Sequence, residues 1–280
     1  MKTLTDSSNW IKQAEILIKK FEKDHSKTYI RKEREYYALF EIGCFLKLIQ
    51  AYKNKKFTIK AIHSSGSGDV FRYLTTPNGN PDNFSYIKLS KENEIFYIRQ
   101  QVRIVQSKNE RIYFTPDITV MHGNTKIKKK NNEQYANNKR AFFYIKSNDV
   151  VAAHECKSLE PFPELFASFL GMFILAHDWA TLQKINPNKN NPHLAPTLFI
   201  GGQARGLHFD MIKAYQEEYP LNIITNIYSG FEKIMAGNFI EAPDVNHPTT
   251  EFSPFEEEIN HAKTSAVAKL QQPEVGDVPF

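Results

Sequence analysis

The sequence is poor in cysteine and lacks a long uninterrupted apolar run. Its two cysteines, Cys44 and Cys156, allow at most one disulfide, and they exclude both the disulfide framework of a small secreted protein and a four-ligand zinc site. The longest apolar stretch, residues 165–176, is too short to cross a bilayer, and residues 1–10 lack the apolar centre of a signal peptide. These absences predict a soluble, cytoplasmic protein without a membrane partner.

Positive charge is present in excess, and it is unevenly distributed. The whole chain carries a formal charge of +5. Because residues 241–280 hold eight acidic and two basic side chains, a net −6, residues 1–240 carry +11. A region this basic favours a polyanion as its partner, either nucleic acid or an anionic membrane surface. We expect residues 1–240 to form one domain with an N-terminal helical elaboration, and residues 241–280 to form an acidic, proline-containing tail or arm.

Helical and strand periodicities alternate along the basic region. The chain is 280 residues long and 41% hydrophobic, enough to bury a sizeable core. Helices are expected at 9–23, 31–52, 164–184, 207–218 and 223–237. Strands are expected at 57–63, 94–105, 111–121 and 194–205, with one or two more within 141–159, while 71–89 is rich in turn signals. This order predicts an α/β fold, of the α+β sandwich type, with a central mixed β-sheet flanked by helices.

Two charged residues end an otherwise apolar strand within 150–159. Strand side chains alternate between faces, so Glu155 and Lys157 point one way and His154 and Cys156 the other. Unpaired buried charge is costly, and a divalent cation with oxygen ligands would keep Glu155 ionised if a second carboxylate completed the site. The alternative is a surface salt bridge between neighbouring strand residues, which stabilises little.

Asp117 is the natural second carboxylate. It follows Pro116 in the middle of the otherwise apolar strand at 111–121. If that strand pairs antiparallel with the strand that carries Glu155, both acids can meet at one cation. Pro116 removes one backbone donor, as expected of a bulge or of diverging strands. Simple turn chemistry after a proline is the alternative interpretation of Asp117.

Pro116-Asp117 and Glu155-Cys156-Lys157 together resemble the PD-(D/E)XK nuclease superfamily, whose members include restriction and repair endonucleases. The order of elements is similar as well: an acid-bearing helix, a strand, the PD strand, the E-x-K strand, a helix and a further strand. The resemblance covers residues 31–220 as topology and short motifs. It implies a restriction-endonuclease-like core and a metal-dependent endonuclease that hydrolyses phosphodiester bonds.

The same resemblance implies a role for each matching residue. Asp117 and Glu155 would bind Mg²⁺, for which Mn²⁺ can substitute, together with the backbone carbonyl of Cys156. Lys157 would position or activate the attacking water. A bound Mg²⁺ lowers the pKa of water and neutralises charge that develops on the scissile phosphate.

Many members of this superfamily add an acid from the first core helix. Glu41 is the candidate here, because it interrupts the apolar run of residues 38–46; Glu35 and Glu33 have less apolar surroundings. A glutamate at this place could bind a metal directly or through water. An ordinary helix-surface carboxylate is the alternative.

A polar, basic insert separates the two acid-bearing strands and is a candidate for phosphate contacts. The basic side chains in question are Lys126, Lys128, Lys129, Lys130, Lys139 and Arg140. The alternative for any one of them is a solvated loop residue.

The leading hypothesis is therefore a Mg²⁺-dependent nuclease in restriction, mobile-element or anti-phage defence. DNA is favoured over RNA by the resemblance alone. The alternatives are a catalytically inactive nucleic-acid-binding module on the same fold and a protein-interaction domain whose basic face binds an acidic regulatory partner. Cutting both strands of a duplex with one site per chain would favour a homodimer.

Overall fold

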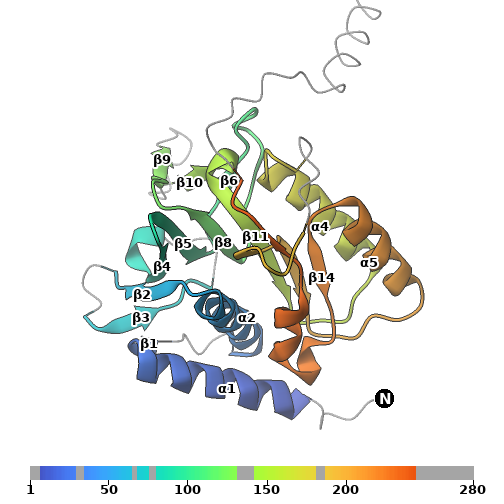
Figure 1. Cartoon of the computed structure of the whole chain (residues 1–280), viewed down its shortest axis with the longest axis horizontal. Coiled ribbons are helices and arrows are strands. Elements are labelled where there is room, and N and C mark those ends of the chain that lie inside the picture. Colours follow the sequence, from blue (N-terminus) through green and yellow to red (C-terminus); the bar gives the residue numbers. More distant parts are fainter. Residues whose placement is uncertain are drawn as a thin grey trace, which may run out of the picture. The chain divides into compact units, whose positions relative to one another are not determined.

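The computed structural model describes residues 7–29, 35–64, 68–75, 80–130, 142–180 and 187–243. All of them belong to one compact unit, Met1–Pro243. Within it, helices lie on both faces of a large mixed sheet (Figure 1). The predicted acidic tail lies outside the described residues except for its first three positions.

The main sheet has seven strands in the order β14-β13-β11-β8-β5-β4-β2. Their bounds are Asn222–Ile224, Thr197–Ile200, Val150–Lys157, Ile118–His122, Glu94–Gln100, Tyr86–Lys91 and Thr58–Ile62. The pairs β11–β13 and β13–β14 are parallel, and the other pairs are antiparallel. The expected mixed sheet flanked by helices is confirmed.

Helix α2 (Glu35–Asn54) packs against one face of this sheet, and α1 (Ser7–Asp24) packs on α2 (Figure 1). Helix α2 is apolar on several sides, with Phe40, Ile42 and Leu48 fully buried, because it lies between the sheet and α1. Both helices agree with the predicted ones, apart from residues 31–34, which lie outside the described part.

Helices α4 (Pro163–Ala176) and α5 (Leu207–Glu218) cover the other face. The prediction for α5 is confirmed. The prediction that the preceding helix continues to residue 184 is wrong, because His177 adopts an extended backbone and caps α4. Its ring nitrogens bond to the carbonyl oxygen of Phe173 and the amide of Ala153.

Two further predictions need correction, and one strand was not predicted. Within the turn-rich stretch 71–89, β4 begins at Tyr86, and its alternating Ile87 and Leu89 are fully buried in the core. The strand expected at 94–105 breaks after β5 and resumes as β6 (Ile104–Val105). The strand expected at 111–121 is likewise split into β7 (Tyr113–Phe114) and β8, with Pro116 and Asp117 between them.

The helix expected at 223–237 is also wrong. Strand β14 begins at Asn222 and pairs with β13, and two 3-10 segments follow, Ile227–Ser229 and Phe231–Ala236. Gly230 separates these two segments with a φ of 157°, a conformation that interrupts any regular helix.

Shorter strands complete the described structure. Strand β1 (Lys27–Tyr29) pairs with β3 (Val70–Arg72), and β12 (His193–Leu194) pairs with β15 (Phe239–Ile240). A separate four-stranded sheet has the order β7-β6-β10-β9, in which β9 is Lys128–Lys130 and β10 is Phe142–Lys146. The presence of β10 before β11 confirms two strands within residues 141–159.

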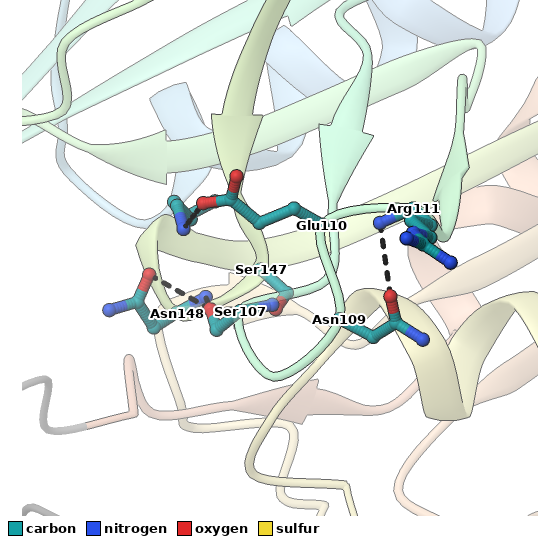
Figure 2. A network of polar contacts seen from close by, with 7 residues as sticks. Ser107, Asn109, Glu110, Arg111, Ser147 and Asn148 are labelled. Atoms are coloured by element: carbon teal, nitrogen blue, oxygen red, sulfur yellow. Dashed lines mark hydrogen bonds and ion pairs between the residues drawn. The ribbon is translucent and has the colours of Figure 1, made fainter.

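Polar contacts fasten this second sheet to the start of β11. Ser107, after β6, and Ser147, after β10, exchange hydrogen bonds, and Ser107 also bonds to Asn148 (Figure 2). Ser147 donates to Asp178, just beyond α4. The segment from β5 to β8 therefore leaves the main sheet, folds over its α4 face and returns at Asp117.

No helix in the described ranges is both long and apolar enough to cross a membrane.

Candidate functional site

Strands β8 and β11 bring Asp117 beside the Glu155-Cys156-Lys157 segment. They pair antiparallel with His154 opposite Ile118, so Asp117 lies just past the last pair and faces the end of β11. Its Oδ2 accepts a hydrogen bond of 2.6 Å from the backbone amide of Cys156. The antiparallel pairing that would let both acids meet is present.

The Lys157 ammonium lies between the two acids. Its Nζ is 2.6 Å from Glu155 Oε2 and 3.5 Å from Asp117 Oδ2. Only 16% of the Glu155 side chain and 14% of the Asp117 side chain are exposed, against 35% for Lys157. This triad is mostly buried, unlike the exposed pairs that contribute little to stability.

Cys156 faces away from the triad, as strand alternation requires. Both cysteines are free thiols, and Cys156 packs with the core on the α2 side of the sheet, where Cys44 is buried. Burial raises the pKa of the Cys156 thiol well above its usual range, and the neighbouring Cys44 thiol adds to the effect. The contribution of Cys156 to the site is therefore through its backbone.

Glu41 reaches the same place from α2 and is only 8% exposed, which excludes the surface alternative. Its Oε1 accepts a hydrogen bond of 3.1 Å from the Gln100 side-chain amide, and its Oε2 one of 3.4 Å from that of Gln101. The Gln101 amide also donates to Asp117 Oδ1 at 2.8 Å. Gln101 thus links the helix acid to the strand acid.

The pKa values of Glu155 and Glu41 are both raised, and burial is the first cause for each. Burial raises the pKa of Glu155 to about 8, and the charge on Asp117 adds to the effect, while Lys157 opposes it. The pKa of Glu41 is also raised well above its usual range, first by burial and then by Asp117. Burial alone would lower the pKa of Lys157, but the charges on Asp117 and Glu155 outweigh it and raise that pKa.

In the described part of the chain, no three His, Cys, Asp or Glu side chains form a group that could hold a metal ion by themselves. The predicted ligand set needs two carboxylates and one backbone carbonyl, and its donors suit Mg²⁺, which prefers oxygen. Asp117 and Glu155 share the single ammonium of Lys157, and the repulsion between these acids and the buried Glu41 is what an added cation would relieve. The donor chemistry of the site therefore fits a divalent cation.

The predicted phosphate-contacting residues are only partly described. Lys126, Lys128 and Lys129 are exposed, the latter two in β9. The side chain of Lys130 and all of Lys139 and Arg140 lie outside the described residues. The three exposed lysines are open to solvent, as a phosphate-binding role requires, and a contact with substrate stays a prediction.

Residues beyond the motif also build the site, and the sequence interpretation did not find them. The side-chain amides of Gln100 and Gln101 donate hydrogen bonds to Glu41. In the sequence, the one sign of this role is two consecutive amides at the end of an apolar strand. Beside Lys157, the Ser158 hydroxyl bonds to that of Tyr228 at 2.8 Å. Gly201 permits this contact, because a Cβ there would overlap the Tyr228 ring.

No protein-family model matches this chain, and searches of the curated proteins and of the solved structures return no match either.

Proposed function

We propose that this chain is a metal-dependent nuclease of the PD-(D/E)XK type, with a restriction-endonuclease-like core. The observation that carries the proposal is the convergence of Asp117, Glu155 and Lys157 at the ends of two antiparallel strands, with the Cys156 amide bonded to Asp117. Burying two acids and an ammonium at a strand end is costly without a function, because hydrophobic residues would stabilise the fold as well or better.

In this proposal Asp117, Glu155 and the Cys156 carbonyl hold Mg²⁺, and Glu41 is a provisional further ligand, directly or through water. The bound ion would supply Lewis-acid polarisation of the phosphate and a lowered pKa for water. The Cys156 amide fixes the Asp117 carboxylate at 2.6 Å. Lys157 orients the attacking water and neutralises charge that builds on the phosphate.

The substrate we propose is nucleic acid, with DNA favoured by the resemblance of the motif. The excess of positive charge over residues 1–240 and the exposed Lys126, Lys128 and Lys129 support a polyanionic substrate. A homodimer would let one site per chain cut both strands, and a regulatory partner protein would suit a role in defence.

A cleavage assay tests the proposal. Plasmid, single-stranded DNA and RNA are incubated with the protein in Mg²⁺, in Mn²⁺ or with EDTA. We expect cutting with either metal and none with EDTA, and loss of cutting in Asp117→Ala, Glu155→Ala and Lys157→Ala. Asp24→Ala and Lys53→Ala are matched controls, because they break an acid–lysine pair on the surface instead of in the site.

The binding-module alternative is favoured by one observation, the lack of a group of three metal-binding side chains among the described residues. It predicts salt-sensitive DNA binding without cleavage in any metal. Wild-type cutting by Glu155→Ala would refute the site, and binding without cutting by the wild-type protein would favour this alternative.

A further inference from the structure

Gln101 adopts a left-handed backbone conformation, with a φ of 52°. In the described ranges, three other residues besides glycine have positive φ: Lys56, Glu92 and Asn226. Those three lie after helix α2, in the β4–β5 hairpin and at the start of a 3-10 segment, where such conformations are common. Gln101 instead directly follows the central strand β5 and is only 8% exposed. Strain kept at a buried position points to a role for the side chain.

The left-handed residue changes where two consecutive side chains point. In an extended strand, Gln100 and Gln101 would face opposite sides of the sheet. Here both side-chain amides reach the same carboxylate, that of Glu41, at 3.1 and 3.4 Å. The Gln101 amide also donates to Asp117 Oδ1 at 2.8 Å, and its backbone N–H donates to the Asp117 carbonyl at 3.0 Å.

We propose that Gln101 is a positioning residue of the nuclease site, which turns the Asp117 carboxylate toward the cation and holds Glu41 beside it. This inference rests on the proposed function. With the Cys156 amide on Oδ2 and the Gln101 amide on Oδ1, both oxygens of Asp117 are fixed. Oδ1 keeps a lone pair for a cation, whereas Oδ2 also lies 3.5 Å from Lys157 Nζ. Gln101 acts through Asp117 and does not itself reach the reacting atoms.

Position 101 requires a neutral side chain that can donate two N–H bonds, and an amide is such a group. It donates N–H to both acids without adding a charge, whereas a glutamate would add a further negative charge to three that already repel. A methionine has the same length and no donor. Replacing Gln101 by methionine therefore removes the two side-chain bonds with little change in volume.

The test compares Gln101→Met with Gln216→Met. The control also loses a glutamine hydrogen bond, here one from the backbone of Ile223 to Gln216 in α5. Mn²⁺ binding is measured by calorimetry, and cleavage is measured as a function of Mg²⁺ concentration. We expect Gln101→Met to weaken Mn²⁺ binding on the order of 10- to 100-fold, as loss of an outer-sphere partner does. Its cleavage should recover at high Mg²⁺, and the control should match the wild-type protein in both measurements.

A glycine variant separates the side chain from the backbone. Gln101→Gly accepts the positive φ and removes the amide, so we expect metal binding as weak as that of Gln101→Met. Glu92→Gly makes the same change in an exposed hairpin and should bind Mn²⁺ like the wild-type protein. Thermal unfolding checks that each variant is folded, and the glycine variant replaces the methionine one if the latter does not fold.

The outcomes distinguish this inference from the function on which it rests. Wild-type Mn²⁺ affinity and Mg²⁺ dependence in both Gln101 variants would overturn the positioning role and leave the nuclease intact. A wild-type protein that neither binds Mn²⁺ nor cuts nucleic acid would overturn both.

Discussion

The two halves of strand β11 accommodate polar groups in opposite ways. Its first half, Val150–Ala153, is apolar and buried, and the polar side chain that meets it is His177. That imidazole donates to the Phe173 carbonyl at 2.7 Å and accepts from the Ala153 amide at 3.1 Å, so it must be neutral with its proton on Nδ1. Each ring nitrogen has a partner within the protein.

The second half of β11 ends in charged side chains that have hydrogen-bond partners but carry more negative charge than positive. Glu155 and Asp117 share the single ammonium of Lys157, and Glu41 is buried near Asp117. Burial, and then repulsion from Asp117, raises the pKa of Glu155 and that of Glu41. A satisfied buried group such as His177 needs nothing further to be stable, whereas a cluster of like charges favours an additional cation. The difference predicts that the first half of β11 serves stability and the second half serves chemistry.

The largest expected effect is on catalysis at the second half. Replacing Glu155 by glutamine keeps its shape and removes its charge, and we expect cleavage to fall by at least about a thousandfold. The free energy of unfolding without metal should stay the same or rise, because a repelling charge is lost. Cleavage rates and urea unfolding in EDTA check the two parts. A strongly destabilised variant would show that the acid is structural and that the two halves of β11 do not differ in role.

The next effect is on stability at the first half. In His177→Ala both hydrogen bonds and the packing of the ring against Phe173 and Trp179 are lost, and the Ala153 amide is left buried without its partner. We expect a loss of about 2–4 kcal/mol in the free energy of unfolding. Urea denaturation measures it, and the cleavage rate per folded molecule should be unchanged. A fall in that rate at unaltered stability would remove the distinction between the halves.

A smaller effect concerns pH. Burial lowers the pKa of His177 to about 4, and the bond to Phe173 only partly opposes this. The unfolded state, with a pKa near 6.5, binds the proton first, so stability should fall as pH decreases from 6.5 toward 4, by up to about 1.4 kcal/mol per pH unit. A His177→Gln variant, which does not titrate, should lose less stability over that range in urea denaturation at pH 7 and 4.5. Equal slopes for both proteins would contradict the neutral, buried state of His177.

The smallest effect is expected far from β11. Lys53 pairs with Asp24 on the surface at 3.1 Å. Lys53→Ala should leave the melting temperature and the cleavage rate at wild-type values, because exposed pairs are screened and cost side-chain entropy. A clear loss of cleavage here would mean that charge removal in general, and not the location of Lys157, explains the effect of Lys157→Ala.

The apolar periodicity predicted the parts of the fold whose residues pack in regular patterns. Helices α1, α2 and α5 and strands β2, β11 and β13 were all predicted, although β13 covers only Thr197–Ile200 of the strand expected at 194–205. Predictions failed where a single residue overrides the pattern. His177 ends α4 with its own side-chain bonds, Gln101 breaks the strand after β5, and Gly230 divides the segment expected to be a helix.

For the candidate site, strand alternation predicted that Glu155 and Lys157 share one face, and the antiparallel pairing of β8 with β11, on which the sequence could only set a condition, brings Asp117 to them. Glu41 was a candidate because a lone acid interrupts an apolar helix, a pattern that a buried acid and a surface acid can share. Gln101 was missed, because the residue pattern of a strand does not indicate where a backbone φ becomes positive.

By itself, the sequence predicted the acids and the lysine of the candidate site, since alternation and apolar runs are local properties of the chain. Only the tertiary structure decided how these residues are held. Asp117 is fixed by the Cys156 amide and by Gln101, and Glu41 is buried against both glutamines. Such bonds join segments far apart in the chain, and they depend on backbone conformations and on packing between α2, β5, β8 and β11 that no local pattern encodes.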